Sequence, residues 1–461
     1  MGATVVQRFA EWAVAARAAP LPEAVLHHAK RAAIDFTAAM IAGARSAPAA
    51  LLERALVEEL DRGGARLALG RRASVRAAAL VNGTAAHAME VDDIYREGIF
   101  HPGAPTIAAA LAVGESQGAS GLAFLRAIVV GYEVGARIAE AMGRAHYRYW
   151  HATGTIGGFG ACAAAAELLE LDAARFAHAL ATAATFAAGL QQAMRGDSTS
   201  KPLHAGRAAE AGLLAALAAR EGARGALDAL EGEAGLGAAM GDAPDWGRAL
   251  AALGGEFRIA RVTFKNHACC GHAFAAIDGA LALRARLAVD ARDIARVRVA
   301  TYRAALEVAG HDDPRTAAEA RFSLRYAVAH ALAHGSVRLA AFEPARLADP
   351  RTRDLMRRIE IAVDPELDRA FPARRAARVA IETADGRRAE HLQPTRVGDP
   401  EQPLSDAQLE DKFVELVAPV LGEDEARARL ARLWRLEQAP ALADFAGAAC
   451  ADANSTGRPL S

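Results

Sequence analysis

The chain has 461 residues, of which 52% are hydrophobic, and a formal net charge of −1 at pH 7. This length is too great for one ordinary hydrophobic core, so it predicts at least two domains. A charge balance this even gives no reason to expect nucleic acid or a membrane surface as a partner.

Cysteine use and the N-terminus indicate the compartment. The four cysteines are Cys162, Cys269, Cys270 and Cys450. An adjacent cysteine pair is a poor basis for a disulfide framework and fits a reducing compartment. The first turns carry Arg8 and Glu11 and lack the apolar core of a signal peptide. We therefore expect a cytoplasmic protein.

The pattern from Val5 to about Leu253 is helical almost throughout, because small and apolar residues recur at helical spacing between Gly, Pro and Asp stops. The expected helices are Pro22–Ala42, Pro48–Arg62, Ser74–Ala88, Thr106–Gln117, Gly121–Met142, Gly157–Leu169, Ala173–Leu190 and His204–Arg220. Alanine at the contacts lets helices approach closely, which predicts a compact bundle.

The pattern changes after about residue 255. Alternation of apolar and polar residues predicts strands, and further apolar periodicity predicts helices. The expected strands or extended segments are Phe257–Thr263, Ile294–Thr301, Ile359–Val363 and Arg378–Thr383, the last followed by a tight turn at Asp385-Gly386. The expected helices are Phe274–Leu287, Ala317–Gly335, Ser405–Leu421 and Glu423–Leu436.

These elements predict a mainly α protein with a large, discontinuous all-helical domain and a smaller α+β domain. We place the first part of the helical domain at residues 1–265 and the α+β domain at 266–398. Residues 399–461 then return to the helical domain and end in a frayed tail. Clefts between domains are frequent ligand sites, so we expect the site there.

The stretch from Met89 to Thr106 concentrates polar chemistry in one loop. It places Asp92 and Asp93 after an Ala-rich helix and then passes Gly98 and His101 before the next helix. Acids, Gly and Pro also mark ordinary helix ends. The loop alone therefore allows two interpretations, a functional site or an ordinary connection between helices.

The lysines add a second indication. The chain has 54 Lys plus Arg, of which only Lys30, Lys201, Lys265 and Lys412 are lysine. A compact ammonium has a tunable pKa that the guanidinium lacks. Lys201 and Lys265 lie in polar, His-containing stretches. Lys30 lies in an amphipathic helical pattern and Lys412 near a helix start, and these two serve as controls. Chance retention is the alternative.

Histidines accompany these lysines, namely His204 near Lys201, and His267 and His272 near Lys265. His151 stands in a separate polar stretch, Tyr149–Thr155. His151 also fits a helix start satisfied by backbone, and Lys201 before Pro202 also fits a solvated loop. The chain has no GxGxxG after a strand, no GxxxxGK[ST], no GxSxG and no HExxH. A zinc site that uses His267 and His272 is a weaker alternative.

Lysines, histidines and paired carboxylates without a nucleotide or metal signature suit one kind of reaction. Ammonium and imidazole donors hold substrate carboxylates, and a histidine moves a proton next to one of them. This equipment favours cofactor-free elimination, decarboxylation or epimerisation of a small polycarboxylate.

Four ordered motifs carry a resemblance. They are Asp92-Asp93 with His101-Pro-Gly, Tyr149-Trp-His-Ala-Thr-Gly-Thr155, Ser200-Lys-Pro-Leu-His-Ala-Gly206, and Phe264-Lys-Asn-His-Ala-Cys-Cys-Gly-His272. From about Val5 to Leu436 the chain resembles the MmgE/PrpD family, which includes 2-methylcitrate dehydratase, cis-aconitate decarboxylase and iminodisuccinate epimerase. The resemblance implies a homodimer with an active site between the domains and no metal or organic cofactor.

The resemblance also implies site residues. Those expected to be catalytic are Asp93, His101, His151, Lys201 and Lys265. Those expected to bind substrate are Asp92, His204, His272 and Tyr326. We expect the lysines to hold substrate carboxylates, His101 and His151 to move protons, and Asp93 to orient His101.

The expected activity is 2-methylcitrate dehydratase-like elimination of water. The segment His101-Pro-Gly-Ala-Pro differs from the His-Pro-Ser-Asp-Asn pattern of the family's dehydratases, so decarboxylation like that of cis-aconitate decarboxylase, and epimerisation, stay open. A carboxylate-binding protein without turnover is the alternative of another class.

Overall fold

The computed structural model describes residues 2–194 and 198–442. The chain forms two compact units, a larger one that runs up to Thr263 and resumes at Ser405, and a smaller one, Phe264–Leu404. The predicted tail at Asp452–Ser461 lies outside the described residues. None of the helices formed by the described part of the chain combines the length and apolarity needed to cross a bilayer.

The larger unit is a helical assembly with one short β-ribbon. Its α-helices are α1 (Val5–Ala16), α2 (Glu23–Gly43), α3 (Ala47–Ala55), α4 (Val75–Ala88), α5 (Gly103–Gln117), α6 (Gly121–Tyr147), α7 (Ala152–Thr155), α8 (Gly157–Leu168), α9 (Ala173–Thr185), α10 (Ser200–Arg220), α11 (Leu236–Met240), α12 (Trp246–Leu250), α20 (Asp406–Leu421) and α21 (Glu423–Leu433). Its 3-10 helices are η1 (Val57–Glu59), η2 (Gln191–Met194), η3 (Arg258–Arg261) and η6 (Leu436–Gln438). The ribbon is β1 (Leu60–Arg66) paired antiparallel with β2 (Arg72–Ala73).

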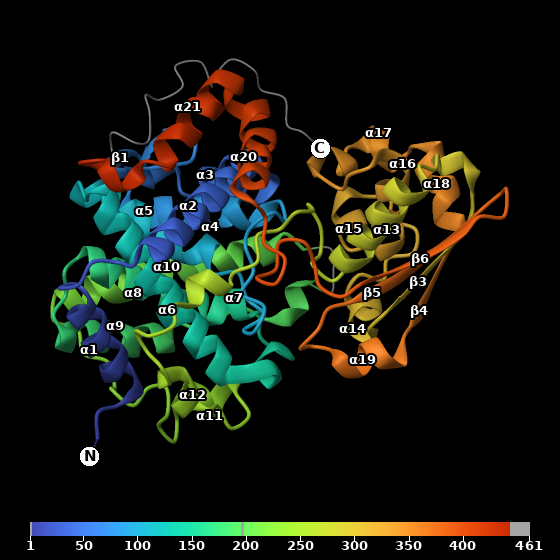
Figure 1. The fold of residues 1–461 in the computed structure, drawn as a ribbon. Coiled ribbons are helices and arrows are strands. Elements are labelled where there is room, and N and C mark those ends of the chain that lie inside the picture. Colours follow the sequence, from blue (N-terminus) through green and yellow to red (C-terminus); the bar gives the residue numbers. More distant parts are fainter. Residues whose placement is uncertain (1, 195–197, 443–461) are drawn as a thin grey trace. The chain divides into compact units, whose positions relative to one another are not determined.

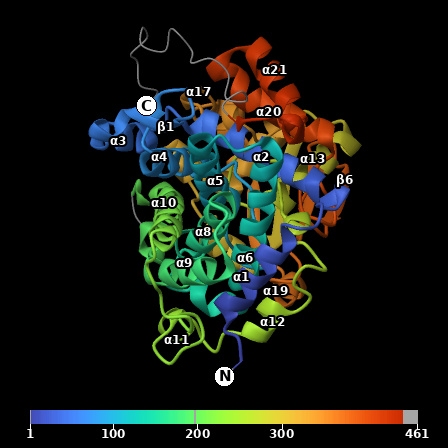
Figure 2. The same cartoon turned by 90° about the vertical axis from the view of Figure 1, so that its left-hand side faces the viewer.

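Alanine and glycine let the central helices of this unit approach closely. Helices α8, α9 and α10 pack side by side, and α4 packs on α10 (Figure 2). A Cβ at Gly212 of α10 would lie 2.2 Å from the carbonyl oxygen of Gly158 in α8, so only glycine fits there. The C-terminal helix α20 packs beside α2 (Figure 1), which joins the two ends of the described chain in one core.

The smaller unit is a four-stranded sheet with helices. Its strands are β3 (Ile294–Thr301), β4 (Ile359–Val363), β5 (Ala377–Thr383) and β6 (Arg388–Gln393), in the order β4-β3-β5-β6. Its helices are η4 (Ala291–Asp293), η5 (Leu339–Phe342), α13 (Phe274–Leu287), α14 (Arg303–Val308), α15 (Ala317–Arg321), α16 (Leu324–His334), α17 (Pro344–Leu347), α18 (Pro350–Arg357) and α19 (Pro365–Ala370).

The pairing within this sheet is mixed. Strand β3 runs parallel to β4 and antiparallel to β5, and β5 and β6 form a hairpin. The hairpin turns at Gly386, whose φ of 86° suits glycine. Helix α13 packs on β5, on β6 and on α16, and this packing buries the alternating apolar residues of β5.

The mainly α fold class with a smaller α+β region is confirmed, and the ribbon β1–β2 is the exception to an all-helical larger domain. The predicted helix Pro48–Arg62 is wrong at its end, because α3 stops at Ala55 and β1 follows. Ala317–Gly335 is two helices, since the Ser323 hydroxyl caps the second by accepting from the Tyr326 N–H at 3.1 Å.

The predicted strand or extended link at Phe257–Thr263 is wrong in its middle, where η3 forms, whereas Phe257 and Val262 are extended and Thr263 pairs with Ile94. Two carboxylates of α6 hold this turn. The Arg258 N–H donates to Glu133 at 2.7 Å, and the Arg258 guanidinium donates to Glu140 at 2.9 Å. These interactions between distant residues outweigh the local alternation that suggested a strand.

Candidate active site

The loop between α4 and α5 follows an unusual backbone path. Glu90 and Ile99 have φ values of 58° and 49°, a region that residues with a side chain rarely adopt. Tyr95 and Phe100 pair across the loop, and Ile94 pairs with Thr263. Strained residues of this kind persist where the surrounding structure holds them, and they concentrate at functional sites.

Within this loop, the Asp92 carboxylate lies between two histidines. Its Oδ2 lies 2.6 Å from His87 Nδ1 and 3.2 Å from His101 Nδ1. His87 is at the end of α4 and His101 just precedes α5, and their ring centroids are 4.7 Å apart. Asp92 and His87 are buried, whereas His101 keeps a small exposed fraction. The predicted relation of Asp93 to His101 is therefore wrong, because the carboxylate beside His101 is Asp92.

His87 was not predicted from the sequence. Burial lowers its pKa to about 3, and the charge of Lys201 acts in the same direction, while the Asp92 carboxylate opposes both. The ring is therefore uncharged near neutral pH. Its Nε2 is buried and has no hydrogen-bond partner among the described residues. A lone histidine in the Ala-rich segment Val75–Ala88 gives no local signal of such a role.

Asp93 has a separate environment. Its Oδ2 accepts from the Tyr132 hydroxyl at 2.7 Å, and its Oδ1 accepts from the Gly103 N–H at 2.9 Å. A Cβ at position 103 would lie 2.8 Å from both side chains, so glycine permits this approach. Burial raises the pKa of Asp93 to about 7, and the charge of Asp35 acts in the same direction.

The raised pKa gives a testable pH dependence. Between about pH 4, where an unfolded aspartate ionises, and pH 7, folding requires Asp93 to keep a proton that the unfolded chain releases. The folded state then binds more protons, so this group makes the free energy of unfolding fall as pH rises through that window. Asp93→Asn should remove this decrease in the free energy of unfolding. In urea titrations, the stability of the variant relative to the native chain should therefore rise from pH 4.5 to pH 7.5. An unchanged difference between the two pH values would contradict the assignment.

His151 and His204 form a second pair. His151 caps α7 and His204 lies on α10, and their Nδ1 atoms are 3.0 Å apart. Burial, then the charges that His87 and His204 would carry, hold the pKa of His151 well below its ordinary value. Burial and Lys201 also lower the pKa of His204. Two uncharged rings at this distance require one Nδ1 to donate and the other to accept, so their tautomers are coupled.

The two pairs adjoin each other. The rings of His87 and His151 are stacked with centroids 5.5 Å apart. The His101 N–H donates to the hydroxyl of Thr153, two residues after His151, at 3.1 Å. The structure therefore gathers His87, His101, His151 and His204 into one histidine cluster.

Lys201 belongs to the same region. Helix α10 begins at Ser200 rather than at the predicted His204, so Lys201 and His204 stand one turn apart on one helical face. The Lys201 ammonium forms an ion pair with Glu90, the residue with the left-handed backbone. Glu90 was not among the predicted residues, because its role depends on this turn of the loop.

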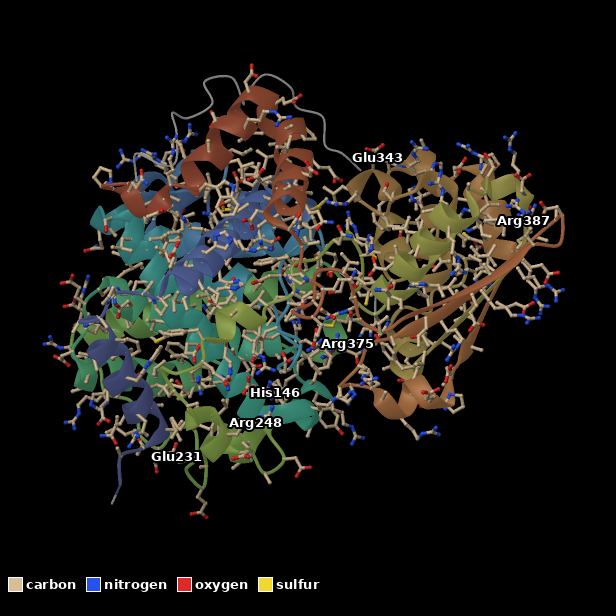
Figure 3. All side chains as sticks on the ribbon, in the orientation of Figure 1. His146, Glu231, Arg248, Glu343, Arg375 and Arg387 are labelled. Atoms are coloured by element: carbon tan, nitrogen blue, oxygen red, sulfur yellow. The ribbon has the colours of Figure 1, made fainter. Side chains whose placement is uncertain are left out.

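A histidine outside the cluster shows the contrast. His146 on α6, labelled in Figure 3, is buried with both ring nitrogens satisfied. Its Nδ1 lies 3.0 Å from the Met240 carbonyl oxygen and its Nε2 lies 2.7 Å from the Thr155 hydroxyl. These contacts give His146 a structural role.

Lys412, used as a control because it was expected near a helix start, does lie on α20, but its side chain is buried. Lys412 is 3% exposed, and its ammonium donates to Asp35 at 2.5 Å and to the Val91 carbonyl oxygen at 2.7 Å. Val91 directly precedes Asp92, so this ion pair between α20 and α2 holds the start of the loop.

The remaining predicted residues lie in the smaller unit. Lys265 is 2% exposed, and His272 Nδ1 lies 3.0 Å from the Tyr302 hydroxyl. His267 Nε2 lies 2.8 Å from Asp278, so the histidines of the alternative zinc site have separate partners. Tyr326 is fully buried and its hydroxyl donates to the Ala341 carbonyl oxygen. The predicted convergence of Lys265 with Lys201 stays a prediction.

Known proteins match nearly the whole chain. Residues 7–249 match the MmgE/PrpD N-terminal domain, and residues 267–438 match the MmgE/PrpD C-terminal domain. A cis-aconitate decarboxylase-like protein of Aspergillus oryzae is 28% identical, over 94% of this chain and 93% of its own. The cis-aconitate decarboxylase of Homo sapiens is 27% identical, over 78% and 76%, and one from Aspergillus terreus is 27% identical, over 83% of both chains.

Proposed function

Because the chain belongs to the MmgE/PrpD family, we propose that it is a cofactor-independent lyase that acts on a small di- or tricarboxylate. The favoured reaction is decarboxylation of the kind named for its relatives, the cis-aconitate decarboxylases. The observation that carries the proposal is the buried histidine cluster with Asp92 and Lys201. It combines proton carriers with a cation that suits a carboxylate.

Decarboxylation balances without an oxidant or reductant. The bond between a substrate carbon and one carboxylate breaks, carbon dioxide leaves, and the electron pair stays on the carbon, which then takes one proton. We assign that proton transfer to His101, whose Nδ1 lies 3.2 Å from the Asp92 carboxylate. His151, coupled to His204, is the second proton carrier. We assign Lys201, with Lys265 from the smaller unit, to the substrate carboxylates that do not react.

Dehydration of a 2-methylcitrate-like hydroxy acid is the second candidate, because the same groups would serve it. One base removes the proton next to a carboxylate, and one acid protonates the departing hydroxyl. Two distinct histidines, His101 and His151, stand ready for two such transfers. The proposal also includes a homodimer, as the resemblance implies, and a cytoplasmic location, as expected from the cysteines and the N-terminal residues. Light scattering of the purified protein would test the dimer.

The test is a panel of di- and tricarboxylates, with cis-aconitate and 2-methylcitrate among them, incubated with the protein in deuterated water. Decarboxylation should release one carbon dioxide per product molecule and place one deuterium on carbon. Loss of water without carbon dioxide would identify a dehydratase instead. Deuterium exchange without a change of formula beyond the label would identify an epimerase. Binding of panel members without exchange or product would overturn the proposal in favour of a binding protein.

A further inference from the structure

The atoms around Asp92 have the composition and spacing of a metal chelate. His87, Asp92 and His101 each place one ligand atom so that all three lie within 4.8 Å of one another. Among the residues that the structure describes, this is the single group of at least three His, Cys, Asp and Glu side chains with that property. We propose that it binds a divalent transition-metal ion such as Zn²⁺, and that the bound ion inhibits the enzyme.

The ligand set fits this class of ion. Two imidazole nitrogens and one carboxylate oxygen are common ligands of Zn²⁺ and its neighbours, at about 2.0–2.2 Å. Tetrahedral ligand atoms at that distance are about 3.3 Å from one another. Asp92 Oδ2 already lies 3.2 Å from His101 Nδ1, its 2.6 Å separation from His87 Nδ1 must widen by less than 1 Å, and the two histidine nitrogens lie within 4.8 Å of each other.

A second observation also indicates a missing ligand. His101 Nδ1, one of the three atoms offered to the ion, is buried and has no hydrogen-bond partner among the described residues. Most buried polar atoms in folded proteins have a partner, so an exception calls for an explanation. A metal ion bound by the ring would supply one.

The local charges permit a cation. Asp92 is the one carboxylate among the three ligand groups. Lys201 is the nearby positive group, but its ammonium is paired with the Glu90 carboxylate. The ion would therefore meet a site with a net negative charge despite the lysine.

Binding should inhibit because the ion uses the same atoms as the reaction. An ion held by His101 and Asp92 removes the proton carrier and its orienting carboxylate together. The inhibition rests on the proposed function, whereas the binding does not. Substrate and ion would both need His101, so a higher concentration of substrate should weaken the inhibition.

The test uses full-length protein freed of metal with a chelator, titrated with Zn²⁺ by calorimetry and with Co²⁺ by visible absorption. We expect one ion per chain bound at this cluster, with a Co²⁺ spectrum of four- or five-coordinate nitrogen and oxygen ligation. His87→Ala and the isosteric Asp92→Asn should each weaken binding at least about tenfold. His178→Ala is the matched control, because the His178 ring contacts the Gly225 carbonyl oxygen away from the cluster.

The results separate this proposal from the lyase assignment. Zinc binding that both His87→Ala and Asp92→Asn leave unchanged would overturn the metal site, even if lyase activity is found. The absence of Zn²⁺ binding to the folded native chain would overturn it as well. Cluster-dependent binding in a protein without turnover would leave the site standing and remove only the inhibition. Circular dichroism of each variant would test whether its fold is retained. If His87→Ala does not fold, Asp92→Asn still tests the site.

Discussion

His101→Ala should lower the turnover number on the true substrate by about 10²–10⁴-fold, the usual contribution of one general acid or base. His101 and His204 are the histidines of the cluster that keep partial exposure, and of these two His101 has its Nδ1 3.2 Å from the Asp92 carboxylate. It can therefore reach a substrate atom while remaining oriented. Steady-state kinetics on the substrate found with the carboxylate panel would measure the loss.

The matched controls separate chemistry from folding. His178→Ala removes an imidazole of the same unit whose Nδ1 contacts a backbone carbonyl oxygen, and it should leave turnover unchanged. Lys201→Ala should raise KM more than it lowers kcat if Lys201 mainly holds a substrate carboxylate. A His101→Ala enzyme with native turnover and native circular dichroism would remove His101 from the mechanism.

Lys412→Met should destabilise the larger unit by about 3–5 kcal/mol, because it leaves the Asp35 carboxylate buried without its cation. Lys412 and Asp35 are 3% and 1% exposed in their side chains, so water cannot replace the lost partner. The released Val91 carbonyl oxygen adds to the cost. Urea unfolding followed by circular dichroism would measure the change as a shift of the unfolding transition.

Lys30→Met is the control for this effect. Lys30 also joins an N-terminal helix to the C-terminal segment, through Glu437, but both side chains keep more contact with water. Its loss should cost less than about 1 kcal/mol, as is typical of ion pairs that water reaches. The double variant Asp35→Leu with Lys412→Met should recover part of the stability, since neither charge is then left alone. Equal costs for the two single lysine variants would contradict the account.

The local sequence pattern was sufficient to predict those helices and strands whose structure depends mainly on their own residues. Strands β3 and β4 were predicted at their observed bounds, because their alternating residues face a covered side and an open side of the sheet. Helix α13 was predicted at its observed bounds from apolar periodicity. The turn at η3 was missed, since contacts of Arg258 with Glu133 and Glu140 more than a hundred residues earlier decide it.

The sequence by itself determined the mainly α class, the family resemblance and the polar segments that contain His101, His151, Lys201 and His204. It could do so because residue types and their spacing are local properties. Only the tertiary structure decided that Asp92 rather than Asp93 stands beside His101, that His87 completes the cluster, and that Lys412 is buried against Asp35. The direction of a side chain in an irregular loop, and the partner of a buried charge, depend on elements that are distant along the chain.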